Sequence, residues 1–362
     1  MNFNDKSKKY TAPFIQLPTN QLMLNVETKV MSAEMGGFIF PVTLNEKEYV
    51  SSYVCSPYNA LVTYGQDELV KIKNPLLRFC LGLLMKTLGM FLSLGKVNKN
   101  VCINNFLLST NPYPNWTGEG ADAHLKEMKA TYPQHAFMYR SLNQHTNKPL
   151  MDHLTSLGYM LIASRQVYIF DSQLCNFSQR NNTQNDRRAL AKSEYELVTH
   201  EQITANDYAD IVTLYNKLYL DKYSKHNPQF SEKLIAYWHE NKLLTMIGLR
   251  DQQGVLQGIV GMLESDQVIT APLVGYNTDL PADKALYRIL IYLILDYSKQ
   301  KGTCLNLSSG ASGFKLLRGG QPFIEYSAIY IKHLPLYRRV TWKIINGLLG
   351  GIYVPLLKRY KL

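Results

Sequence analysis

Cysteine is scarce in this sequence, and the few cysteines show no order. There are five in 362 residues, an odd number, scattered singly and mostly within apolar runs. They match neither a disulfide framework nor the spacing of metal ligands, and the eight histidines also lack ligand spacing. The sequence therefore predicts buried thiols in a reducing compartment and no metal site.

Short motifs that mark several common enzyme classes are absent as well. No Walker or Rossmann glycine pattern occurs, and there is no serine-nucleophile elbow. No apolar core segment follows the polar start Met1 to Lys6, so we expect no secretory signal. These absences favour a cytoplasmic protein, and the first dozen residues are expected to be unstructured.

Acidic residues are few, which leaves the chain strongly basic. There are 28 Asp and Glu against 39 Lys and Arg, a net charge of +11, and residues 332–362 contain no acid at all. The charge implies an anionic partner: a nucleotide, a nucleic acid or a lipid head group. The segment 336–362 is basic, aromatic and apolar, which suits an anionic membrane surface. The alternative is a helix that docks on its own domain.

No uninterrupted apolar run is long enough to suggest a membrane span. The nearest candidate, 76–94, is broken by Arg78 and Lys86 and weakened by two glycines. The two cations fall on one side of a helix, so the pattern predicts an amphipathic helix. We expect it to be buried on one side or to lie in a membrane interface, which would make the protein peripheral on the cytoplasmic face of a membrane.

Strand and helix patterns alternate along the chain, which predicts an α/β (α+β) fold with mixed, mostly antiparallel sheets flanked by helices. The polar, basic stretch 176–192 predicts a boundary between an N-terminal unit, 1–185, and a C-terminal unit, 186–335. The expected strands are 37–42, 48–54, 101–108, 136–141, 159–171, 195–199, 243–249, 255–264, 268–276, 304–307 and 323–330. The expected helices are 76–94, 121–130, 148–157, 207–223, 231–240 and 284–298.

The stretch Ser308 to Lys315, SSGASGFK, carries the strongest signal for a site. It follows a short apolar strand, and Arg318 comes three residues later. A Gly/Ser-rich turn that opens a helix presents backbone N–H groups, and two cations beside it would hold an oxyanion or a phosphate. The same pattern is also ordinary punctuation between a strand and a helix.

The order of elements in the second half resembles the acyl-CoA N-acyltransferase (GNAT) fold, and two such units resemble the tandem-GNAT proteins, which include the Fem peptidyltransferases and related acyltransferases of peptidoglycan biosynthesis. The turn at 308–315 and the segment Gly319-Gly320-Gln321-Pro322 with Glu325 are similar to Fem-like sequences. Ser56-Pro57-Tyr58 before 64–68 resembles their early substrate-facing turn. The loop 275–283 departs from the family, because it has two acids and no second glycine where classical members bind CoA pyrophosphate.

The resemblance implies transfer of an acyl group from an activated donor, acyl-CoA first, to an amine that is a small molecule or lipid-linked. One alternative is a Fem-like transferase that uses aminoacyl-tRNA and a lipid-linked cell-wall precursor; the other is a non-catalytic membrane-surface protein. Lys315 would stabilise an oxyanion or phosphate, and Glu325 would be the base or a structural partner of Lys315. Tyr326 and Tyr276 could donate a proton, although packing is the commoner role in a chain with 25 tyrosines, and a lone histidine such as His226 is more often a surface residue. The expected catalytic residues are Lys315, Glu325 and Tyr326; the expected donor-binding residues are Tyr276, Asn277, Ser309, Gly310, Gly313 and Arg318; the expected acceptor-binding residues are Tyr58, Trp116, Tyr223 and His226.

Overall fold

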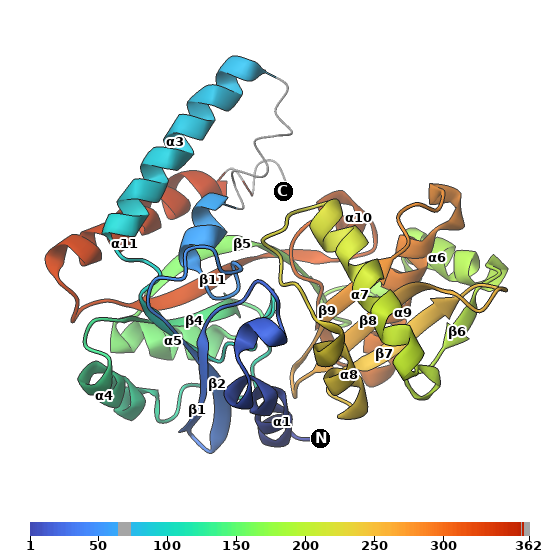
Figure 1. The fold of residues 1–362 in the computed structure, drawn as a ribbon, viewed down its shortest axis with the longest axis horizontal. Coiled ribbons are helices and arrows are strands. Elements are labelled where there is room, and N and C mark those ends of the chain that lie inside the picture. The colour runs from blue at the N-terminus through green and yellow to red at the C-terminus, as the bar shows by residue number, and fades with distance from the viewer. Residues whose placement is uncertain (64–73, 356, 358–362) are drawn as a thin grey trace.

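The computed structural model describes residues 1–63, 74–355 and 357 (Figure 1). Within these residues the strands form one eleven-stranded sheet of mixed direction, in the order β1-β2-β3-β4-β11-β5-β10-β9-β8-β7-β6. The predicted mixed α/β fold is confirmed. The strands are β1 Lys29–Met35, β2 Phe38–Asn45, β3 Asn100–Ile103, β4 Ala136–Asn143, β5 Met160–Phe170, β6 Glu196–Val198, β7 Thr245–Arg250, β8 Leu256–Glu264, β9 Val268–Tyr276, β10 Cys304–Asn306 and β11 Gln321–Tyr330. The helices are α1 Phe3–Gln16, α3 Pro75–Leu94, α4 Ala121–Thr131, α5 Lys148–Leu157, α6 Asn181–Lys192, α7 Tyr208–Asn216, α8 Glu232–Glu240, α9 Leu286–Lys301, α10 Ser312–Leu317 and α11 Leu336–Leu348.

The two halves of the chain repeat one pattern. Each has an antiparallel run of strands followed by one parallel pair, β3 with β4 in the first half and β9 with β10 in the second. A helix crosses over between the members of each pair, α4 in the first half and α9 in the second. Parallel neighbours need such a crossover because the first strand ends at one end of the sheet and the second strand begins at the other.

The last strand of the chain lies in the first half of the sheet. β11 is inserted between β4 and β5 and pairs antiparallel with both, while the other edge of β5 pairs with β10. β5 and β11 therefore join the two halves (Figure 1). The predicted division at residue 185 falls within α6 and produces no break in the sheet, so it stays a prediction about domain organisation.

Helices cover both faces of the C-terminal part of the sheet. Gly258 pairs with Tyr276 and Ile259 with Gly275, so the two glycines face opposite sides. A Cβ on Gly258 would meet Leu290 of α9, whereas one on Gly275 would lie 2.5 Å from the Tyr215 backbone nitrogen of α7. The absent side chain at Gly275 therefore lets α7 approach the sheet closely.

The predicted strand at 37–42 is confirmed as β2, but other segments among the first 56 residues differ from the sequence prediction. The expected strand at 48–54 is wrong: the Ser51, Cys55 and Ser56 amides donate to carbonyls three or four residues back, as in turns. The missed strand is β1, which joins β2 through a Gly36-Gly37 hairpin in which both glycines have positive φ. The start of the chain, expected to be unstructured, is α1, which begins after the Asn2 side chain caps the Asp5 amide.

The two helices expected at a membrane surface lie together at one end of the molecule (Figure 1). α11 docks on the sheet through Trp342 and Ile345, which are buried, and the buried Arg338 donates to carbonyls of residues 95, 96 and 99, just after α3. The outer faces of both helices stay exposed. Within the described chain, no helix combines the length and apolarity needed to cross a membrane.

Candidate active site

A cavity of about 670 Å³ lies along the junction of the two halves. Its walls come from β3, β4, β5 and β11, from the turn between β10 and α10, and from α9 and α11. This volume is typical of a small-molecule site. Four of the described lining residues are charged: Arg140, Arg165, Lys315 and Glu325. Three basic side chains against one carboxylate favour an anionic ligand.

Arg165 and Glu325 form an ion pair across the strands that join the halves. They are register partners on β5 and β11, with Arg165 Nε 2.8 Å from Glu325 Oε1 and Nη2 3.3 Å from Oε2. The register shifts beside Glu325, and the extra residue on β5 is Ser164, whose hydroxyl also donates to Glu325. A bulge of this kind redirects side chains, which explains why residues 162–166 all line the cavity.

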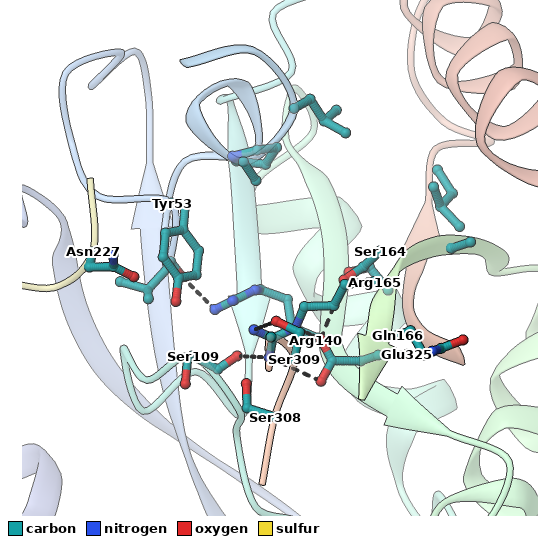
Figure 2. A pocket seen from close by; sticks show the side chains of 18 of the residues that line it. Tyr53, Ser109, Arg140, Ser164, Arg165, Gln166, Asn227, Ser308, Ser309 and Glu325 are labelled. Atoms are coloured by element: carbon teal, nitrogen blue, oxygen red, sulfur yellow. Dashed lines mark hydrogen bonds and ion pairs between the residues drawn. The ribbon is translucent and has the colours of Figure 1, made fainter. Parts of the chain in front are cut away.

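Arg165 also connects loops from both halves of the chain (Figure 2). Its guanidinium donates to the Ser109 carbonyl and the Thr110 hydroxyl, and Nη1 lies 3.4 Å from the Ser309 hydroxyl in the turn after β10. Since the Glu325 side chain is only 3% exposed, the carboxylate depends on Arg165 for its charge balance. The pair therefore fixes the geometry of the middle of the cavity.

Arg140 supplies a second guanidinium in the same region. It projects from β4, where Nη1 donates to the Val54 carbonyl at 2.6 Å and to Asn105 Oδ1 at 3.1 Å. Tyr53 faces it in Figure 2. Burial raises the pKa of Tyr53, and the charges of Arg165 and Arg140 partly oppose that rise, so the phenol stays protonated at neutral pH.

Lys315 lines the cavity, but its ammonium group is committed to the turn before it. Nζ donates to the carbonyls of Leu307, Ser308 and Ser309 at 2.8, 3.3 and 2.8 Å. Burial, followed by the charge of Arg165, lowers the pKa of Lys315 to about 7. The three carbonyl acceptors favour the charged form. Lys315 therefore holds the turn in place from within the cavity.

The Gly/Ser turn forms one wall, as a short run of left-handed backbone. Ser308, Gly310 and Ala311 all have positive φ, and residues 308–311 face the cavity. This conformation is unfavourable for Ser and Ala, so the surrounding bonds must maintain it. Lys315 is well placed to do so.

The end of the cavity beneath α11 is apolar. Its walls combine β4, β5 and β11 with α11 and the turns that follow it. An aliphatic chain would be desolvated there, while polar groups would remain near Arg165. The lining residues at this end are Leu61, Met138, Ile162, Ile329, Trp342, Ile345, Leu349 and Leu357.

Five of the predicted site residues line the cavity: Lys315, Glu325, Ser309, Gly310 and Tyr223. Eight others lie outside its lining, and the motif at 64–68 lies outside the described residues. The eight are Tyr326, Tyr276, Asn277, Gly313, Arg318, Tyr58, Trp116 and His226.

Several of these eight have specific structural contacts. Arg318 is buried and binds both carboxylate oxygens of Asp186, at 2.5 and 3.0 Å, and its guanidinium stacks on Phe314. Trp116 is buried against Phe40, and its indole N–H donates to the Glu119 carbonyl.

The remaining predicted residues lie outside the cavity lining in strands, short helices and loops. The Asn277 amide is occupied by Lys217 and Gln257, and Tyr276 packs beside Tyr287. Tyr58 lies against Gly89 of α3. The His226 carbonyl accepts from the Ser52 hydroxyl, Tyr326 packs on the core, and open space surrounds Gly313.

Sequence reasoning missed the two arginines that dominate the middle of the cavity. Arg140 and Arg165 each lie in a strand that is otherwise largely apolar. A charged residue inside such a strand is rarely buried unless it is paired, and this was the signal that could have found them.

Comparisons with known proteins find structural neighbours of low sequence identity. No family model and no curated protein matches the chain. A FemX structure is 12% identical, with a TM-score of 0.46, over 61% of this chain and 79% of that one. The C-terminal domain of a protein assigned as a lysylphosphatidylglycerol synthetase from Agrobacterium fabrum is 13% identical, with a TM-score of 0.45, over 64% and 78%. A tandem GNAT protein from the clavulanic acid biosynthesis pathway is 10% identical, with a TM-score of 0.37, over 64% and 75%. All three are GNAT-fold proteins, the group that the sequence resembles.

Proposed function

We propose that this protein is an acyltransferase that moves an acyl group from an activated donor, with acyl-CoA as the first candidate, to an amine inside the cavity. The observation that carries the proposal is the polar middle of the cavity, where Arg140, Arg165 and Glu325 lie beside an apolar extension. The cations suit the anionic part of a donor, and the extension suits an aliphatic chain.

The reaction would use the buried ion pair. Once Glu325 has taken one proton from the ammonium group, the amine nitrogen attacks the thioester carbonyl carbon. The C–S bond breaks as the amide forms, and the second proton lost by the nitrogen goes to the departing thiolate, which leaves as a thiol. Arg165 and Arg140 would stabilise the negative charge that develops on the carbonyl oxygen. Glu325 would attract the ammonium form of the acceptor and accept its proton. Lys315 would position the turn at 308–311 rather than touch the reacting atoms.

Turnover by variants at this pair tests the proposal. Glu325→Gln should abolish acyl-CoA-dependent acylation of an amine panel, measured as thiol release. Tyr326→Phe is the matched control, because Tyr326 lies next in the strand and outside the cavity lining, and it should keep full activity. Equal activity of Glu325→Gln and the wild type would refute the role of the pair.

We also propose that the protein works on a membrane surface. Exposed apolar side chains project from α3 and α11, including Leu76 at 72%, Phe79 at 70% and Leu336 at 66% exposure. The two helices contain Lys and Arg but no acid, which suits anionic lipids. The apolar end of the cavity lies beneath α11, so a lipid-linked acceptor or a long-chain donor could reach it.

Vesicle binding tests the membrane proposal separately. Leu83→Glu places a charge on the exposed face of α3 and should weaken sedimentation with phosphatidylglycerol vesicles. Val255→Glu, on an exposed hairpin of the second half, is the matched control and should bind like the wild type. Equal binding of all three proteins would exclude this face of α3.

A Fem-like aminoacyl-tRNA-dependent transferase is the second candidate. The observation that favours it is the loop before α9, where Asp279 is paired with Lys217 and Asn277 is already hydrogen-bonded. An acidic residue there disfavours a CoA pyrophosphate at the helix N-terminus. Transfer from aminoacyl-tRNA with no response to any acyl-CoA would select this candidate. Binding to vesicles without transfer from either donor would select the non-catalytic membrane protein.

A further inference from the structure

Three side chains with metal-binding atoms meet at the end of β5 that is remote from the cavity. His145, Asp171 and Cys304 offer a nitrogen, an oxygen and a sulfur that all lie within 4.8 Å of one another. Asp171 follows β5 and comes five residues after Gln166, which lines the cavity. At about 3.3 Å per residue the two positions are about 16 Å apart. This group is therefore separate from the proposed active site.

The structure orients His145 toward this group. It lies in the loop between β4 and α5, where its backbone N–H donates to Asn143 Oδ1 at 3.0 Å. Its ring stacks on Phe323, with ring centroids 5.2 Å apart and planes at 29°. Nε2 lies 2.8 Å from Asp171 Oδ2. The residue is thus held by a backbone hydrogen bond and by stacking on the face of its ring, and Nε2 points at the Asp171 carboxylate.

Asp171 and Cys304 are brought together by strand pairing. Leu305 of β10 pairs with Phe170 of β5, which places the preceding residue, Cys304, beside Asp171. One carboxylate oxygen of Asp171 accepts the Gln173 amide, and the other is turned toward His145. Cys304 is a free, half-buried thiol. All three side chains are partly shielded from solvent, as is common for metal ligands.

We propose that His145, Asp171 and Cys304 bind one divalent transition metal ion, with Zn²⁺ as the first candidate. Imidazole, carboxylate and thiolate are the ligands that Zn²⁺ uses, and a water would complete a tetrahedron. Zinc-ligand bonds of about 2.0 to 2.3 Å place ligand atoms about 3.5 Å apart, so small side-chain rotations suffice. Binding displaces the thiol proton to solvent as the Zn–S bond forms.

The ion would join the two halves of the chain. His145 follows β4 of the first half, Cys304 begins β10 of the second, and Asp171 directly follows β5, the strand that both halves share. The sequence predicts no metal site because positions 145, 171 and 304 are far apart and form no local pattern. The expected role is structural, and it does not depend on the proposed acyltransferase activity.

Metal titration of the full-length, chelator-treated protein under reducing conditions tests this proposal. We expect one equivalent of Zn²⁺ to bind and raise the unfolding temperature, and one equivalent of Co²⁺ to show a thiolate-to-cobalt charge-transfer band. Cys304→Ser should lose the band and bind Zn²⁺ more weakly, by on the order of a hundredfold. His145→Asn should also weaken binding while the thiol remains.

Cys175→Ser is the matched control, because Cys175 is another half-buried free thiol and lies outside the group. It should keep both the charge-transfer band and the affinity. Absence of binding, a Co²⁺ complex without the band, or a band lost in Cys175→Ser and kept in Cys304→Ser would each overturn the proposal.

Discussion

Breaking the Arg165–Glu325 ion pair should lower the free energy of unfolding of the protein. At an effective dielectric constant of about 20, opposite charges about 4 Å apart attract by about 4 kcal/mol. Desolvation of the two groups offsets part of this gain, because Glu325 is 3% and Arg165 19% exposed. Removing either partner leaves the other buried without its counter-charge, so Glu325→Gln and Arg165→Met should each lower the free energy of unfolding by about 3 kcal/mol.

A double-mutant cycle by urea unfolding measures the coupling. The double variant should be less destabilised than the sum of the two single variants, by about 2 kcal/mol. The exposed pair Lys148–Asp152, with side chains 59% and 63% exposed, is the control and should couple by less than about 0.5 kcal/mol. Additive effects at Arg165 and Glu325 would show that the buried pair does not act as a unit.

Two further predictions concern the cations that the sequence placed at the site. Burial lowers the pKa of Lys315 to about 7, whereas the same side chain in the unfolded protein has a pKa near 10.5. Between these two pH values the unfolded state binds more protons than the native state, so the free energy of unfolding should rise with pH. Between pH 7 and 9 the wild type should gain about 2 kcal/mol in unfolding free energy relative to Lys315→Met, and parallel pH profiles would contradict the shift. Arg318→Met should destabilise the protein by about 3 kcal/mol, because Asp186 is fully buried and, among the described residues, keeps Arg288 alone as an ion-pair partner. The substitution should leave donor affinity unchanged. A stable Arg318→Met protein with weakened donor binding would restore the donor-binding role expected from the sequence.

Local patterns predicted much of the fold. The helix at 148–157 has the predicted bounds, and the meander from β7 to β9 and the buried helix α9 lie within a few residues of their predicted positions. These elements carry clear apolar periodicity and are bounded by turn residues. The insertion of β11 between β4 and β5 could not be predicted, because it depends on pairing between segments about 160 residues apart, which no local pattern encodes.

The candidate site could be predicted only in part, because local patterns reveal its turn but not its long-range strand pairing. The turn at 308–315 is a local signal, and Ser309, Gly310 and Lys315 do line the cavity. The partner of Glu325 is set by long-range strand register, so the structure pairs it with Arg165, whereas the sequence suggested Lys315, ten residues away. Arg318 looked like a cation of the same turn, but a helix six residues long points it at Asp186 instead.

Calorimetric titration with CoA, acetyl-CoA and a long-chain acyl-CoA measures whether an acyl-CoA donor occupies this cavity. Ala60→Trp is a variant that narrows the cavity at an exposed lining residue. Four methylene groups buried in the apolar end add about 3 kcal/mol, or about a hundredfold in affinity. We expect the long-chain donor to bind most tightly and Ala60→Trp to weaken its binding. Failure of every acyl-CoA to bind, or binding that is indifferent to both chain length and Ala60→Trp, would contradict an acyl-CoA donor in this cavity.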